Sequence, residues 1–327
     1  MERGTLNYEL CTVNYELCTI NMNYKLLYPL FYLLSLLPFW ALYLLSDFAY
    51  LIIYKMVGYR TRVVRNNLRT SFPEKSDEEL KTIERKFYHW LCDYFLEALK
   101  LLSISKKELD RRFIMTNPEV ITDCFKEGQN VAAMLGHYCN WEWLSRVGKD
   151  FYKDAANADD KWKVGLIYHP LYSKVFNQLL IDIRTCESSV TVPKNDILRQ
   201  LVTFKCEGIM SIFGYISDQA PKWENIHLWL PFLNHDTPVF TGGERIMRRM
   251  NDAIFYVEMG RPKRGYYTCT YHLITKEPNS LPEHEITRRF FQMLEKTIQQ
   301  NPEYYLWSHN RWKRTHEEYN RRFGITE

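Results

Sequence analysis

The longest apolar pattern in the chain lies near its start. Residues Leu26–Ser46 form a stretch of 21 residues without a charged side chain, bracketed by Lys25 and Asp47. At about 1.5 Å per residue a helix of that length is roughly 32 Å long, enough to cross a hydrocarbon core of about 30 Å. A second apolar run, Phe48–Tyr54, follows it. We therefore predict a membrane-anchor helix within residues 22–57.

Basic residues are distributed unevenly around this stretch. Only Arg3 and Lys25 precede it, whereas five follow closely: Lys55, Arg60, Arg62, Arg65 and Arg69. Under the positive-inside rule this asymmetry places the large C-terminal part of the chain in the cytoplasm. A cleaved signal peptide and a buried core helix are the alternatives. The signal peptide is disfavoured because the apolar run exceeds about 7–15 residues and no A-x-A cleavage site follows it.

A second periodic pattern predicts a long helix after the basic segment at residues 58–75. Ser76 opens it with S-D-E-E, a capping box in which Glu79 reaches back to the Ser76 amide. Apolar residues then recur at spacings of three and four: Leu80, Ile83, Phe87, Leu91, Tyr94, Ala98 and Leu101. An apolar stripe over about six turns is typical of a helix that packs one face on a core.

From Val131 onward, short apolar runs alternate with helical patterns. The predicted strands are Val131–Leu135, Val164–Tyr168, Val190–Val192, Ile209–Ile216, Ile254–Glu258 and Tyr266–Leu273. The predicted helices are Trp141–Lys149, Ser173–Ile183, Asp196–Lys205, Glu244–Asn251 and Glu283–Gln300. Such alternation is typical of an α/β fold with a mixed, largely parallel sheet flanked by helices. Because no Pro-, Ser- or Gly-rich linker divides this region, we treat residues 58–327 as one domain.

The first residues of the chain carry a short repeat. The sequence NYELCT occurs at Asn7–Thr12 and again at Asn14–Thr19. Two copies without an apolar stripe are too few for a coiled coil, which needs about three or four heptads. We interpret residues 1–21 as a disordered tail, or as non-native sequence upstream of a start at Met22.

Composition narrows the classes of protein. The 327 residues are 46% hydrophobic and 25% charged, which excludes disordered and collagen-like chains. A formal charge of +4 is too small for a dedicated nucleic-acid binder, so no nucleic-acid partner is expected. A mean hydropathy of -0.38 excludes a polytopic membrane protein. The eight cysteines contain no CxxC pair, which argues against a thiolate zinc site and fits a reducing compartment.

The first candidate chemistry follows the strand predicted at Val131–Leu135. There Gly136 and His137 precede Glu142 in an H-x4-E spacing. Ligands of open α/β sheets bind beyond the carboxyl ends of strands. Histidine is a natural general base near neutral pH, and a carboxylate beside it fixes its tautomer and stabilises the imidazolium. The spacing alone is common, and its plain alternative is a core histidine and a capping glutamate, with Asn140 as the helix N-cap.

Further motifs are spread over the rest of the chain. They are Val64–Leu68 (VRNNL) with Ser71–Pro73, Ile167–Leu171 (IYHPL) with Asn177 and Arg184, Asp196, Ser217–Gln219 (SDQ), and Glu303–Lys313 (EYYLWSHNRWK). Together with the H-x4-E motif they resemble those of the late lipid A biosynthesis acyltransferases of Gram-negative bacteria, the lauroyl/myristoyl transferases. The resemblance runs from about Met22 to the end of the chain.

This resemblance implies a reaction and a location. A hydroxyl of a 3-hydroxyacyl chain on a Kdo-bearing lipid A precursor would attack an acyl thioester carried by acyl carrier protein. His137 would take the hydroxyl proton, and Glu142 would hold His137. The fold would be glycerolipid-acyltransferase-like, without cofactor or metal. The enzyme would sit at the cytoplasmic face of the inner membrane, in contact with membrane lipid.

The resemblance also implies substrate-binding residues: Asn140, His169, Arg184, Asp196, Asp218, Gln219, Arg311 and Lys313. His169 departs from the family, which usually has an arginine there that contacts substrate phosphate or sugar. Further cations for a phosphorylated acceptor are Arg60, Arg62, Arg65 and Arg314. Candidates for lining an apolar acyl slot are Trp141, Trp143, Phe213 and Tyr215, for which core packing is the alternative.

Two other functions remain as alternatives. One is an acyltransferase for another membrane glycolipid or phospholipid that uses acyl-CoA. The other is a non-catalytic, membrane-anchored interaction protein in which the H-x4-E motif has decayed. The enzyme interpretation predicts that His137 and Glu142 face each other at an opening toward the bilayer, and side chains that face apart would argue against it. Gly242-Gly243, before the helix Glu244–Asn251, forms either a simple turn or a weak phosphate site.

Overall fold

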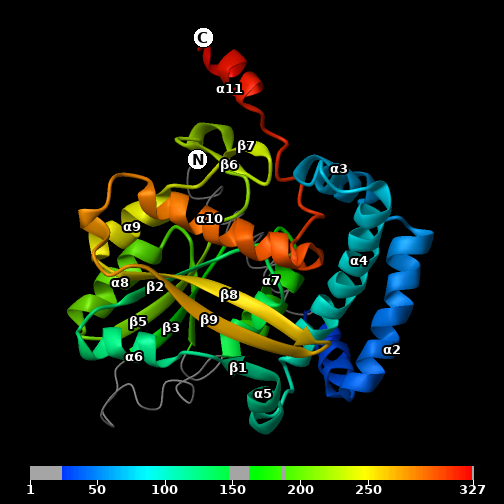
Figure 1. Cartoon of the computed structure of the whole chain (residues 1–327). Coiled ribbons are helices and arrows are strands. Elements are labelled where there is room, and N and C mark those ends of the chain that lie inside the picture. The colour runs from blue at the N-terminus through cyan, green and yellow to red at the C-terminus, as the bar shows by residue number, and fades with distance from the viewer. Residues whose placement is uncertain (1–23, 147–161, 186–188, 326–327) are drawn as a thin grey trace, which may run out of the picture.

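One mixed sheet forms the centre of the molecule, which the computed structural model describes at residues 24–146, 162–185 and 189–325 (Figure 1). Its strands run in the order β1-β9-β8-β2-β5-β3-β4. They are β1 (Phe113–Met115), β2 (Val131–Leu135), β3 (Trp162–Tyr168), β4 (Ser189–Pro193), β5 (Met210–Ile216), β8 (Ala253–Lys263) and β9 (Tyr266–Thr275). β8 and β9 are antiparallel, and every other neighbouring pair is parallel. The predicted α/β fold with a mixed, largely parallel sheet is therefore confirmed.

The strand β2 lies in the middle of this sheet, because β5 pairs with one of its edges and β8 with the other. All five of its residues are buried. Parallel strands that are covered on both faces are apolar throughout rather than alternating, which is why short apolar runs predicted them. All six predicted strands are present. β1 and the antiparallel hairpin of β6 (Trp229–Phe232) and β7 (His235–Pro238) were not predicted.

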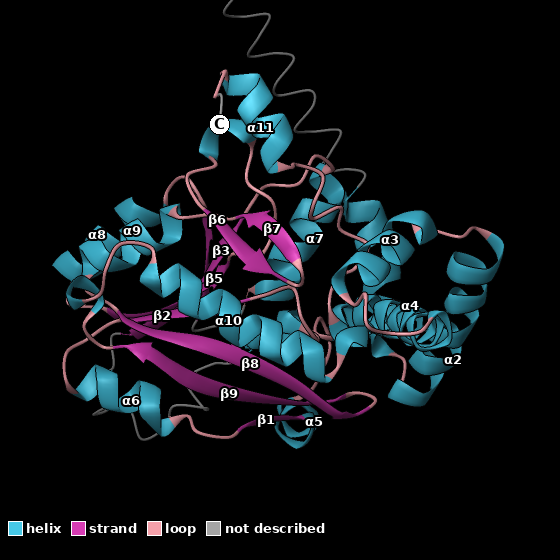
Figure 2. Ribbon diagram, turned by 45° about the horizontal axis from the view of Figure 1, so that its top comes forward, coloured by secondary structure: helices cyan, strands magenta, loops and turns pink. Residues whose placement is uncertain are grey.

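Helices surround the sheet, and α2, α3 and α4 gather at one side of it (Figure 2). The first helix covers residues 24–36. The α-helices that follow are α2 (Phe39–Tyr50), α3 (Thr61–Ser71), α4 (Asp77–Lys100), α5 (Lys106–Arg112), α6 (Glu119–Lys126), α7 (Lys174–Arg184), α8 (Ile197–Cys206), α9 (Gly242–Met250), α10 (Glu285–Gln300) and α11 (His316–Phe323). Shorter elements are the π-helix η1 (Leu51–Met56) and the 3-10 helices η2 (Trp141–Arg146), η4 (Trp223–Asn225), η5 (Pro278–Ser280) and η6 (Pro302–Tyr304).

Beyond the N-terminal apolar stretch, the predicted helices are present with small shifts at their ends, with one exception. The pattern at 141–149 forms the 3-10 helix η2, and residues 147–149 lie outside the described part of the chain, as does the predicted tail at 1–21. The capping box of α4 is confirmed, since the Ser76 amide donates to Glu79 Oε2 at 2.8 Å and the Glu79 amide donates to Ser76 Oγ at 3.4 Å. The seven apolar residues of its predicted stripe are all buried.

The apolar stretch Leu26–Ser46 is not the single helix that was predicted. The helix at 24–36 ends before Pro38, and α2 begins at Phe39. Proline has no amide hydrogen and its ring clashes with the preceding turn, so it interrupts the helix. The longest apolar helical segment is instead Phe39–Met56, formed by α2 and η1, which is long and apolar enough to cross a membrane by length and composition alone.

Candidate active site

The candidate site lies where two neighbouring parallel strands end. Leu135, the last residue of β2, is the register partner of Ile216, the last residue of β5. His137 and Asp218 each follow two residues later. Equal offsets from adjacent strand ends bring these two side chains together at the carboxyl edge of the sheet, where ligands of such folds bind. A Cβ at Gly136 would lie 2.7 Å from the Leu294 side chain of α10, so a larger residue in this turn would force that side chain to shift.

His137 and Asp218 form a closely bonded pair. The Nδ1 atom of His137 lies 2.6 Å from Oδ1 of Asp218, and the His137 amide donates to Oδ2 at 3.0 Å. An ionised carboxylate can only accept hydrogen bonds, so the contact at 2.6 Å is donated by the Nδ1–H group of His137. In the neutral imidazole this leaves Nε2 as the acceptor. The Nε2 atom of Gln219 lies 3.1 Å from His137 Nε2 and donates to it. The imidazole therefore presents a basic nitrogen away from its carboxylate.

The carboxylate of Asp218 is buried, with only 2% of its surface exposed. Burial by itself raises the pKa of a carboxyl group, but the charge of His137 and its two hydrogen bonds outweigh this and hold the pKa of Asp218 below its usual range. The Arg311 guanidinium lowers it further. Burial lowers the pKa of the neighbouring His309 to about 4, so that ring is neutral at pH 7. Asp218 is thus an ionised partner for one specific imidazole.

Glu142 does not bond to His137, in contrast to the prediction from the H-x4-E spacing. Its carboxylate accepts two hydrogen bonds from Arg184, at 2.7 Å from Nε and 2.5 Å from Nη2. The Tyr94 hydroxyl donates to it at 3.2 Å. The predicted dyad is wrong because η2 turns Glu142 toward α7, whereas Asp218 approaches His137 from the neighbouring strand. Arg184, expected to contact substrate, is engaged by this carboxylate.

The other expected substrate-binding residues lie in three places: in the cleft, in the protein interior, or outside both. His169 and Gln219 line the same cleft as His137, and so does Arg184. Asn140 is fully buried and donates to Glu97 at 3.1 Å, so it faces the protein interior. Arg311, expected to bind substrate, is 1% exposed and donates to the Pro238 carbonyl at 2.7 Å, so its side chain lies in the protein interior.

Asp196 and Lys313 lie outside the residues that line the cleft. Asp196 stands at the start of α8, as expected, and pairs with Arg199 at 2.8 Å. Lys313 is exposed in the segment before α11. Neither side chain therefore contributes to the described cleft walls.

The cleft beside His137 has a volume of about 870 Å³. Three basic residues that were not singled out from the sequence line it: Lys194, Arg245 and Arg249. Lys194 directly follows β4, so the strand-end rule that located His137 was also a signal for this residue. The two arginines stand on α9, and the Gly242-Gly243 pair at its start also lines the cleft.

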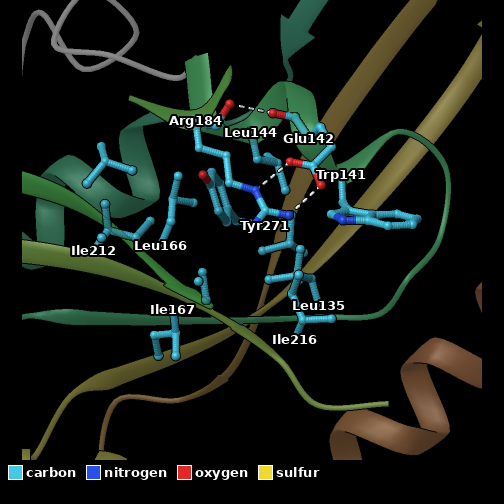
Figure 3. Close-up of a pocket in the computed structure, with 16 residues that line it drawn as sticks. Leu135, Trp141, Glu142, Leu144, Leu166, Ile167, Arg184, Ile212, Ile216 and Tyr271 are labelled. Atoms are coloured by element: carbon cyan, nitrogen blue, oxygen red, sulfur yellow. Dashed lines mark hydrogen bonds and ion pairs between the residues drawn. The ribbon is translucent and has the colours of Figure 1, made fainter. Parts of the chain in front are cut away.

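A smaller apolar cavity of about 60 Å³ (Figure 3) shares part of its lining with the cleft. Trp141, Glu142, Ile167, Arg184 and Ile216 line both spaces. The figure shows the bonded Glu142–Arg184 pair beside aliphatic side chains such as Leu135, Leu166 and Ile216. Of the aromatic residues predicted for an acyl slot, Trp141 lines this cavity and Tyr215 the cleft, whereas Trp143 and Phe213 are packed in the core.

Acid–base chemistry at a carboxylate-supported imidazole is what this arrangement can perform. Within the described residues, no group of three or more His, Cys, Asp and Glu side chains is placed to hold a metal ion. The cleft has three basic side chains on its walls as well as the imidazole, and the neighbouring cavity is lined mainly by apolar side chains. Such a site suits a substrate with an anionic head and a hydrocarbon chain.

Comparison with protein families places the chain in one of them. A family model described as bacterial lipid A biosynthesis acyltransferase matches residues 22–314. No curated protein matches the chain. The matched region includes the sheet, the His137–Asp218 pair and all the residues that line the cleft and the cavity.

Proposed function

The chain belongs to the bacterial lipid A biosynthesis acyltransferase family, and from this membership we propose that it transfers a fatty acyl group from acyl carrier protein to a hydroxyl of a 3-hydroxyacyl chain on a Kdo-bearing lipid A precursor. The reaction would take place at the cytoplasmic face of the inner membrane. The observation that carries the proposal is the imidazole of His137, bonded to buried Asp218 and presenting Nε2 to a large cleft. A glycerolipid-acyltransferase-like fold forms part of the same proposal.

His137 acts as the general base in this proposal. The acceptor hydroxyl takes the place of the Gln219 amide at His137 Nε2, transfers its proton there and attacks the thioester carbonyl. Asp218 holds the Nδ1–H tautomer and stabilises the imidazolium that forms. As the tetrahedral intermediate collapses, the C–S bond breaks and the departing thiolate receives the proton from Nε2. The ester product and the free carrier thiol balance the reaction.

The cations of the cleft suit the phosphorylated head of such an acceptor. Lys194, Arg245 and Arg249 are exposed, and each lines the cleft. Charge-assisted hydrogen bonds to phosphate are about twice as strong as neutral ones. His169 stands on the same cleft wall in place of the arginine of the family pattern, so we assign it to the sugar or phosphate contact as well.

The apolar cavity, at about 60 Å³, has room for a few methylene groups of the donor's acyl chain. It shares Trp141 with the cleft as a lining residue and is bounded by Leu135, Leu166 and Ile212. An acyl chain entering it passes the Glu142–Arg184 pair and leaves its thioester near His137. Glu142 then supports the wall of this passage, rather than the base, through its bonds to Arg184.

Replacement of the base tests the proposal. His137→Ala should lower the rate of acyl transfer by about 10²–10⁴-fold, because general-base assistance contributes on that order. Transfer is measured with labelled acyl-carrier-protein donors and a tetra-acyl acceptor, and circular dichroism establishes that the variant is folded. Near-wild-type turnover would refute the assignment and favour the non-catalytic interaction protein.

The donor and acceptor are tested separately. Purified wild type should prefer acyl carrier protein over acyl-CoA as donor, and equal use of both would favour the alternative glycolipid acyltransferase. Mass spectrometry of lipid A from a deletion strain should show the loss of one acyl chain. An unchanged lipid A profile would contradict the assigned acceptor.

A further inference from the structure

The N-terminal helices expose an apolar surface that no described residue covers. More than half of the exposed large apolar side chains in the described chain lie between Leu26 and Tyr59. On α2, Trp40, Leu44 and Phe48 are 61–68% exposed and recur every four residues, so they form one stripe. The exposed leucines of the helix at 24–36 are Leu26, Leu27, Leu30, Leu33 and Leu36. Contiguous exposed apolar surface of this kind marks an interaction site.

The opposite face of α2 is fixed to the body by polar contacts. Ser46 donates to Asp93 Oδ1 at 2.6 Å, and both residues are buried. The next residue, Asp47, accepts from Arg264 Nη2 at 2.6 Å. A bilayer-spanning α2 would break these bonds and place the Asp47 carboxylate within the hydrocarbon, which costs several kcal/mol. Figures 1 and 2 show α2 on the outer side of α4, as these contacts require.

Hydrogen bonds also hold the segment around Pro38, where the helix at 24–36 ends and α2 begins. The Lys100 ammonium donates to the carbonyls of Ser35 at 2.7 Å and Leu37 at 2.9 Å. Ser103 donates to the same Ser35 carbonyl at 2.6 Å. These bonds satisfy carbonyls at the end of the helix at 24–36, where no further helical partner exists. Both helices therefore have defined positions against α4 and cannot join into one long span.

The exposed surface is continuous with the wall of the active-site cleft. Tyr24 donates a hydrogen bond to Asp182 of α7, and the rings of Phe31 and Phe176 lie 6.3 Å apart. The helix α7 also lines the cleft, through Asn177 among others. Exposed apolar side chains at this rim are Leu171, Tyr172 and Phe176. A hydrocarbon surface covering the N-terminal helices would thus reach the rim of the cleft.

We propose that the helix at 24–36 and α2 lie in one leaflet of an anionic bilayer, with their exposed apolar stripes inserted and without crossing the membrane. The choice of a bilayer as partner rests on the proposed function, since a lipid A-type acceptor resides there. Charge supports it, because Lys25, Lys55 and Arg62 are exposed basic residues at the ends of this segment. The acceptor then moves from the leaflet into the cleft at the α7 rim.

Vesicle binding tests the surface. The triple variant Trp40→Glu/Leu44→Glu/Phe48→Glu should bind phosphatidylglycerol vesicles at least tenfold more weakly than the wild-type full chain in sedimentation assays. The matched control, Ile114→Glu/Val202→Glu/Leu273→Glu, adds the same charge at exposed apolar positions elsewhere and should bind like wild type. Equal loss in both triple variants, or no loss in the first, would overturn the proposed surface.

Topology tests the non-spanning arrangement. With one epitope tag at each end of the full chain, both tags should be accessible to protease on the same side of sealed membrane vesicles. Tags on opposite sides would show a spanning helix and overturn the proposal. A wild-type protein that binds vesicles but transfers no acyl group to the tetra-acyl acceptor would contradict the proposed function and leave this docking surface intact.

Discussion

Asp218, rather than Glu142, is the carboxylate on which the activity of His137 should depend. Asp218→Asn keeps the size of the side chain but no longer favours the Nδ1–H tautomer or stabilises the imidazolium. We expect kcat to fall by about 10²–10⁴-fold, as when an orienting aspartate is neutralised in a catalytic triad. Steady-state transfer assays measure this, and thermal unfolding serves as the folding control. A variant with more than half of the wild-type kcat would contradict the pairing.

Sequence reasoning placed His137 just after a strand, as the structure has it, but predicted Glu142 rather than Asp218 as its hydrogen-bonded partner. His137 follows a predicted strand, where ligands of open sheets bind, so its position was sufficient. Glu142 was chosen because it is near in sequence. Asp218 stands 81 residues further on and reaches His137 only because β5 pairs with β2. Strand order is a tertiary property that apolar periodicity does not encode, so the correct pairing was not derivable from the pattern.

The titration of Asp252 should make the free energy of unfolding depend on pH. Burial raises the pKa of this carboxyl group from 3.8 to about 7. The folded protein therefore keeps a proton that the unfolded chain releases above about pH 4, and stability is lost as the pH rises through 7.

The variant Asp252→Asn has no ionisable group at this position, so it should not lose stability in this way as the pH rises. Its advantage over wild type in the free energy of unfolding should grow between pH 5 and pH 8, reaching about 2–4 kcal/mol. Urea denaturation at both pH values measures it, with the exposed Asp123→Asn as control. A pH-independent difference between Asp252→Asn and wild type would show that Asp252 is already ionised in the folded state.

Among the elements, η2 and α7 are joined by the Glu142–Arg184 pair, which is structural in our assignment. Only 3% of the Glu142 side chain and 18% of the Arg184 side chain are exposed. Arg184→Met leaves a buried carboxylate unpaired and should lower the free energy of unfolding by about 3 kcal/mol. Glu142→Gln combined with Arg184→Met should recover most of that loss, as a double-mutant cycle by denaturant unfolding can measure. Additive effects of the two single changes would argue against a coupled pair.

Elements with a strong local signal were predicted well, and those that depend on neighbours were not. The capping box and stripe of α4 are local, and so are the apolar runs of the parallel strands. β1 has three residues and exists through its pairing with β9. At the N-terminus, the prediction of one helix followed from the length of the charge-free stretch. Pro38 lies within that stretch, and proline interrupts helices, so the sequence does contain the signal for two helices.

At the scale of the whole molecule, segments distant in sequence combine into one cleft with two chemical halves. His137 and Asp218 follow the ends of β2 and β5, while basic side chains come from the end of β4 and from the helix α9. The helix α7 contributes Arg184 to the lining of the apolar cavity. The N-terminal helix at 24–36 contacts the same helix, through Phe31 and Phe176. This arrangement would suit the proposed reaction, in which the anionic head of the acceptor, the thioester and the hydrocarbon chain of the donor each need a different surface.

The cationic half of that cleft gives a prediction for substrate affinity. No ion pair engages Arg245 or Arg249 in the part of the chain that is described, so both are available to phosphate. The double variant Arg245→Ala/Arg249→Ala should raise KM for the phosphorylated acceptor about tenfold and change kcat less than about threefold, because charge-assisted contacts hold the head and not the reacting atoms. The increase should shrink as ionic strength shortens the Debye length. Arg321→Ala/Arg322→Ala removes the same charge on α11, outside the cleft, and should leave KM unchanged. A fall in kcat alone would place the two arginines at the reacting ester instead.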